Sequence, residues 1–69
     1  MSALPPHQQR VVDEKAELDK KGKALITFIE YDNIFTTLDP AEQGRLREQK
    51  EVMRRYSEIL GARIAAFNP

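Results

Sequence analysis

A helix-start signal in the middle of the chain, Asp39-Pro40-Ala41-Glu42, constrains the fold more than any other feature of the sequence. Asp39 can accept hydrogen bonds from the first free backbone N–H groups of a helix, and Pro40 at the first helical position loses no donor that the helix needs. Glu42 can complete a capping box by accepting from the Asp39 N–H. Since helical patterns lie on both sides of this signal, the sequence predicts an all-α fold, an antiparallel helical hairpin.

The segment before the signal carries an apolar residue at every seventh position, namely Val11, Leu18 and Leu25. Charged residues fill the other faces, a pattern typical of an amphipathic helix. We expect this helix to run from about residue 6 to 31 and to be followed by a short turn at 32–38. Gly22 falls near the apolar seam, where a glycine costs about 1 kcal/mol relative to alanine. The sequence therefore predicts that a facing helix approaches closely at Gly22.

The segment after the signal predicts a second helix, from about residue 40 to 67, with two apolar strips. An antiparallel alignment would place the first strip against the first helix, with Leu46, Met53 and Leu60 opposite Leu25, Leu18 and Val11. The second strip could then pack on a second copy, giving a homodimeric four-helix bundle. The sequence does not say which strip faces which neighbour, and one wide intrachain face is the competing interpretation. The strip residues are Leu46, Met53, Leu60 and Phe67 in the first, and Val52, Ile59 and Ile64 in the second, with Tyr56 shared between the two.

The length of the chain also favours self-association. With 69 residues it forms one small domain, 1–69. The free energy that such a domain gains by burying apolar surface is nearly cancelled by the loss of conformational entropy, which costs about 1.5 kcal/mol per ordered residue. The chain has no cysteine, so disulfides cannot supply the missing stability. A second copy is the simplest remaining source of buried surface.

The turn between the helices is unusually apolar for the tip of a charged molecule. Ile34 and Phe35, with Leu38, can fold back as a plug over the end of the hairpin. If some of these side chains face water instead, they form a recognition patch. The candidate partner-binding residues are Phe28, Tyr31, Ile34 and Phe35.

Composition and motifs argue against several classes of function. Eleven Lys and Arg residues balance eleven Asp and Glu residues, so no long-range field favours nucleic acid or an anionic membrane. No apolar stretch approaches the roughly 20 residues that span a bilayer. Catalytic, dinucleotide and metal motifs are absent, and His7, the only histidine, lacks ligand partners. We therefore expect no enzymatic activity, no cofactor, no metal, no nucleic acid and no membrane partner.

Charged residues are expected to form local pairs on the helix surfaces. Asp19 with Lys23, and Glu51 with Arg55, are four residues apart and can pair. The basic residues of the segment 45–55 scatter around the helix, which is typical of a solvated face. An acidic protein partner for this segment is the alternative, since no aromatic residues interleave to stack on bases.

A resemblance to a known group sharpens the function. The residues that carry it are Arg10 to Asp19, Phe28-Ile29, Gln49, Met53, Tyr56, Leu60 and Arg63-Ile64. With these residues the chain resembles small phage-encoded helical-hairpin proteins of the anti-quorum-sensing (Aqs) type. The resemblance implies a dimer of hairpins in the host cytoplasm that binds and disables a host regulator. It implies a LasR-type quorum-sensing transcription factor as target, with the type IV pilus assembly ATPase as a second one. A structural coiled coil or assembly component without inhibitory activity is the alternative.

Overall fold

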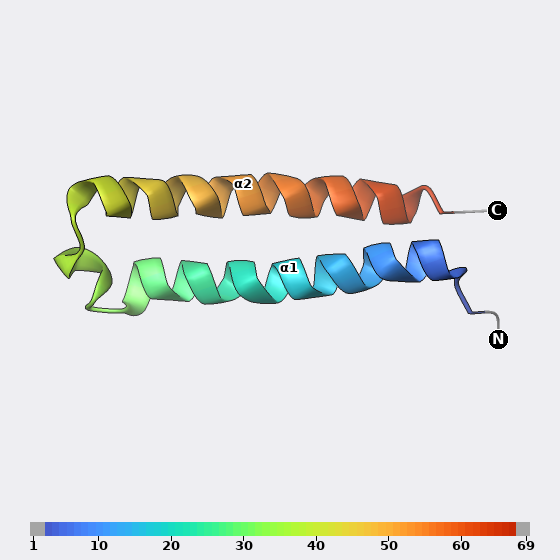
Figure 1. Cartoon of the computed structure of the whole chain (residues 1–69), viewed down its shortest axis with the longest axis horizontal. Helices are drawn as coiled ribbons and strands as arrows, with labels where there is room; N and C mark the ends of the chain where they lie inside the picture. The colour runs from blue at the N-terminus through green and yellow to red at the C-terminus, as the bar shows by residue number, and fades with distance from the viewer. Residues whose placement is uncertain (1–2, 68–69) are drawn as a thin grey trace.

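Two long antiparallel helices make up most of the computed structural model, which describes residues 3–67 (Figure 1). Helix α1 spans Pro6–Tyr31, the short 3-10 helix η1 spans Phe35–Thr37, and α2 spans Pro40–Ala65. The molecule measures 50 × 18 × 15 Å, with both termini at the end opposite the turn. The predicted helical hairpin is confirmed, although α2 ends two residues before the predicted Phe67. Among the described residues, no helix is long and apolar enough to cross a membrane.

The start of α2 follows the predicted N-cap only in part. Asp39 Oδ2 accepts a hydrogen bond from the Ala41 N–H at 3.1 Å, and Pro40 occupies the first helical position, as expected. The predicted capping box is wrong, because the Glu42 carboxylate accepts from Arg45 Nε at 2.8 Å instead. The side chain of Gln43 donates to the Leu38 carbonyl at 2.9 Å. This amide therefore ties the first turn of α2 to the preceding loop.

The end of α1 is set by an aspartate. Asp32 stands at the C-cap in an extended conformation, and its Oδ1 accepts a hydrogen bond from the Ile34 N–H at 2.8 Å. This bond between a side chain and the backbone two residues on is the Asx-turn geometry that competes with helix continuation. The chain then passes directly into η1, so the whole connection between the two long helices is eight residues, 32–39.

Phe35 of η1 plugs the end of the hairpin. Its side chain is only 1% exposed and meets the Phe28 ring edge-on, with ring centroids 5.9 Å apart at 88°. The Arg47 guanidinium lies 4.9 Å from the centroid of the same ring, within cation–π range. Of the plug predicted for this turn, Phe35 is buried and Leu38 is half-buried, whereas Ile34 is exposed. Phe35, one of the predicted partner-binding residues, is thus buried in the hairpin, and Phe28 is half-buried beside it.

The two apolar strips of α2 have different environments. Leu60 is fully buried, and Leu46, Met53 and Phe67 are half-buried, as are Leu18 and Leu25 on α1, where Val11 is buried. In the second strip, Val52, Tyr56 and Ile59 are exposed, whereas Ile64 is half-buried. The first strip therefore packs within the chain, whereas the second faces solvent at Val52, Tyr56 and Ile59.

The register of the two helices differs from the predicted alignment. Met53 faces Gly22 rather than Leu18, and Ser57 Oγ donates a hydrogen bond to Asp19 Oδ1 across the helix pair. Each α2 residue thus faces a position about one turn further along α1 than predicted. The length of the connection between the helices sets this offset, and seven-residue periodicity alone does not encode it.

The burial of Phe35 predicts that this side chain contributes strongly to the stability of the hairpin. Truncation of the ring in Phe35→Ala should lower the free energy of unfolding by about 3–5 kcal/mol, because it leaves a cavity and removes the contact with Phe28. Urea unfolding followed by far-UV circular dichroism measures the loss. Ile34→Ala is the matched control, since that neighbouring side chain is 59% exposed, and should change stability by less than about 0.5 kcal/mol. Equal losses in the two variants would refute the plug.

Candidate binding surfaces

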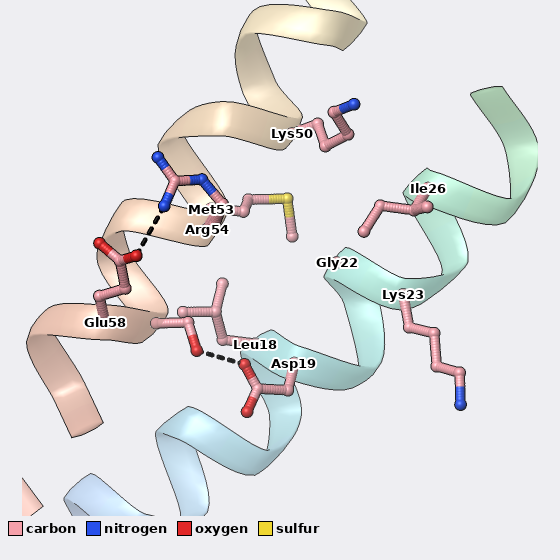
Figure 2. Close-up of a pocket in the computed structure, with 10 residues that line it drawn as sticks. Leu18, Asp19, Gly22, Lys23, Ile26, Lys50, Met53, Arg54 and Glu58 are labelled. Carbon is pink, nitrogen blue, oxygen red and sulfur yellow. Dashed lines mark hydrogen bonds and ion pairs between the residues drawn. The ribbon is translucent and has the colours of Figure 1, made fainter. Parts of the chain in front are cut away.

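One long side of the hairpin is hollowed into an open groove of about 310 Å³ between α1 and α2 (Figure 2). Its lining is mostly apolar, with Leu18, Gly22 and Ile26 contributed by α1 and Met53 by α2. Gly22 helps to open the groove because it presents no side chain toward the Met53 thioether. Charged and polar side chains surround this floor: Asp19, Lys23, Lys50, Arg54, Ser57 and Glu58.

A hydrogen-bonded carboxylate closes one end of the groove. Asp19 accepts a 2.7 Å ion-pair hydrogen bond from Lys15 Nζ and a second hydrogen bond from the Ser57 hydroxyl. The hydrogen bond from Lys15 is the larger cause, and that from Ser57 the next, of a lowered pKa for the Asp19 carboxyl. The predicted pair of Asp19 with Lys23 is not formed, because Lys15 occupies the carboxylate. This leaves Lys23 outside any ion pair among residues 3–67.

Some of the cationic side chains around the groove form ion pairs within the chain and others do not. Arg54 Nε donates to Glu51 at 3.1 Å and its Nη1 donates to Glu58 at 2.6 Å, contacts that raise the pKa of Arg54. The predicted pair of Glu51 with Arg55 is therefore replaced, and Arg55 instead contacts Glu58 at 3.4 Å. No described residue forms an ion pair with Lys50, whose side chain extends from α2 on the side of Ile26 (Figure 2). The unbalanced positive charge at the groove thus comes from its two lysines.

The close approach of the helices lies elsewhere than predicted. A Cβ built on Gly22 would meet Met53 Cε at 3.9 Å, an ordinary van der Waals distance, so the packing there does not require glycine. A Cβ on Gly61 would lie only 3.3 Å from Lys15 Cε. The tighter contact is thus at Gly61, which was not singled out from the sequence because it falls outside the seven-residue pattern.

The second exposed surface is a face of α2 that we term the α2 strip, formed by Val52, Tyr56 and Ile59. Spacings of four and three residues place these side chains in one row along the helix. All three are exposed, and Val52 is 61% exposed. None of them lines the groove.

The third exposed surface lies at the end of the hairpin, where Tyr31 and Ile34 form what we term the tip pair. These side chains are 78% and 59% exposed, the former at the end of α1 and the latter next to η1. Of the four predicted partner-binding residues, these two are the ones whose side chains face water. The four predicted residues thus fall into an exposed pair, Tyr31 and Ile34, and a pair of packed phenylalanines, Phe28 and Phe35.

Sequence reasoning did not identify the groove. Ile26, Lys23 and Lys50 belong to different periodic positions on separate helices, and only the register brings them around one hollow. The glycine near the seam was the available signal, since it marked where side-chain volume is missing between the helices. Among residues 3–67, no group of three or more potential metal ligands is assembled.

Comparisons with known proteins identify one family. The model of the family described as Sequestin matches residues 5–66, which covers both helices and the turn between them. Comparisons with curated proteins and with solved structures give no match.

The carboxylate at the end of the groove makes a pH prediction. Because hydrogen bonds lower the pKa of Asp19 below its ordinary 3.8 in the folded chain, its stabilising contribution is present above that value. The contribution is lost as the pH falls through the folded-state pKa. The difference in melting temperature between the natural chain and Asp19→Asn should therefore shrink as the pH falls from about 6 to about 2.

Thermal melts followed by circular dichroism at a series of pH values measure this difference. Glu14→Gln is the control, since that exposed carboxylate accepts no hydrogen bond from another described side chain. The difference in melting temperature between Glu14→Gln and the natural chain should vary less with pH. A constant gap between the natural chain and Asp19→Asn down to pH 2 would contradict the assignment.

Proposed function

The chain belongs to the Sequestin family, and on that premise we propose that it is a sequestering protein, which binds a partner and holds it away from its other contacts. Such a protein needs affinity and no reaction chemistry. It acts by mass action, shifting its partner toward the bound state in proportion to differential affinity. We propose that it has no enzymatic activity.

The tip pair is the observation that best supports a protein as the sequestered partner. Tyr31 and Ile34 expose large apolar side chains on a turn that the buried Phe35 anchors. A recognition patch held in place before binding loses less conformational entropy on association than a mobile one. Aromatic and aliphatic anchors of this kind carry most of the energy in protein interfaces.

The proposal extends to the class of partner and the setting. The resemblance to Aqs-type phage proteins supports a host regulator, with a LasR-type transcription factor as the leading target and the type IV pilus assembly ATPase as the second. In this proposal the chain is phage-encoded and acts in the host cytoplasm. A structural assembly component is the competing function, and it would form large oligomers instead of stopping at a defined complex.

We also propose that the active form is a homodimer with four helices. Within residues 3–67, the single hairpin buries three apolar side chains, Val11, Phe35 and Leu60, which is a small core for a chain of 69 residues. An exposed apolar strip remains on α2. A second copy would cover this strip and supply the missing burial.

The groove supports a second candidate function, sequestration of a small anionic molecule. Its apolar floor and its two lysines outside ion pairs match a ligand that has a flat apolar part and a phosphate group. A volume of about 310 Å³ lies at the lower end of the range for small-molecule sites. The two candidates use separate surfaces, so they can be tested separately.

Capture from a host lysate tests the protein-partner function. A tagged natural chain should retain a host regulator at moderate salt, and the double variant Tyr31→Ser with Ile34→Ser should retain at least about tenfold less, the effect of removing one hot-spot contact of about 1.4 kcal/mol or more. Leu4→Ser is the control, since Leu4 is an exposed apolar residue two positions before the start of α1, far along the chain from the turn. Recovery of the same protein by the tip variant and the control would rule out the tip.

Equilibrium dialysis against inorganic phosphate and a panel of ribonucleotides tests the groove. A ligand that the natural chain retains should be bound at least about tenfold more weakly by Lys50→Glu, which replaces an attractive charge with a repulsive one. Lys20→Glu makes the same charge change on α1 outside the groove and should bind normally. Equal binding by the two variants would exclude the groove as the site.

A further inference from the structure

The α2 strip matches a second copy of itself. We propose that two hairpins dock through Val52, Tyr56 and Ile59, with their α2 helices antiparallel about a two-fold axis near Tyr56. This inference deepens the proposed homodimer by naming its surface and orientation. It does not depend on which molecule is sequestered.

The accessible surface of the hairpin exceeds that of a typical monomer of its mass, which favours such a partner. The chain exposes 5400 Å², whereas a monomeric globular protein of 7.9 kDa exposes roughly 4,400 Å². The excess of about 1,000 Å² compares with the roughly 800 Å² that each partner buries in a standard interface.

The spacing of the strip is self-complementary in the antiparallel orientation. Val52 and Ile59 lie on either side of Tyr56, four and three residues away. An axis near Tyr56 places Val52 of one copy opposite Ile59 of the other, and brings the two tyrosines together at the centre. A two-fold interface uses the same patch on both copies, so each contact occurs twice.

The charges at the two ends of the strip select the orientation. Glu48 lies one turn before Val52, and Arg63 lies one turn after Ile59. Neither residue forms an ion pair within residues 3–67. In the antiparallel dimer, Glu48 of each copy meets Arg63 of the other, whereas a parallel dimer would place like charges opposite each other. Arg55, the charged residue beside Tyr56, is already in contact with Glu58 of its own chain.

The proposed dimer leaves the other surfaces free. The α2 residues that line the groove are Lys50, Met53, Arg54, Ser57 and Glu58, none of which belongs to the strip. Antiparallel docking also sends the two tip pairs to opposite ends of the assembly. One dimer thus presents two grooves and two tips, which predicts that it binds two partners.

A charge swap tests the dimer and its orientation. Sedimentation equilibrium at low salt should give the natural chain a mass of twice 7.9 kDa. Glu48→Arg and Arg63→Glu should each weaken dimerisation at least about tenfold, because each places two like-charge pairs across the interface. The double variant carrying both changes should recover to within about threefold of the natural chain, because opposite charges face each other again. Lys20→Glu, away from the strip, should leave the dimer intact.

Two further measurements make the result decisive. Tyr56→Asp should give a monomer, because it places two like charges close together at the centre of the interface. Circular dichroism of each variant above and below its dissociation range separates loss of the dimer from loss of helix. If the natural chain is monomeric, the proposed dimer is wrong, and the α2 strip would have to bind a different partner.

A dimer that ignores the single charge reversals, or a double variant weaker than both singles, would overturn the antiparallel docking and leave the homodimer standing. Failure to retain any host protein or nucleotide, with this dimer intact, would count against the sequestering function and not against the docking.

Discussion

The burial of Phe35 between the ends of the helices is the interaction on which the rest of the structure depends. The ring packs edge-on against Phe28 and lies under Arg47, so it joins the end of α1 to the start of α2. With Asp32 ending one helix and Asp39 capping the next, the plug fixes the length and direction of the turn. This turn then sets the register in which the two helices pack.

That register decides which side chains are left for other molecules. Two helices in contact can cover only one stripe of each other, and here the stripe includes Val11 and Leu60. The α2 strip and the tip pair lie outside this stripe, and the groove opens where the stripe leaves Leu18 and Met53 only half-buried. A sequestering protein benefits from this arrangement, because its surface is large relative to its core and separate faces can serve self-association and partner binding.

The charged residues also divide into those that are paired within the chain and those that are left for other molecules. Arg54 and Asp19 are satisfied by neighbours within the chain, and their pKa values shift in the directions that stabilise the ionised forms. Lys23 and Lys50 at the groove, and Glu48 and Arg63 beside the α2 strip, have no ion-pair partner in residues 3–67. With zero net charge overall, these local residues rather than a long-range field would set specificity.

The sequence by itself determined the two helices and the short connection between them, whereas the tertiary structure decided which apolar strip of α2 packs within the chain. The helices and their connection depend on local chemistry, since a capping aspartate, a proline at the first helical position and a seven-residue repeat act over short distances. Only the tertiary structure decided the register, the plugging of Phe35 and the groove between Gly22 and Met53. These depend on how an eight-residue connection folds against both helix ends, and shifting one helix by a single turn exchanges every facing pair without changing either periodic pattern. The Asp39 signal therefore predicted where the second helix begins, while packing of the turn determined what that helix faces.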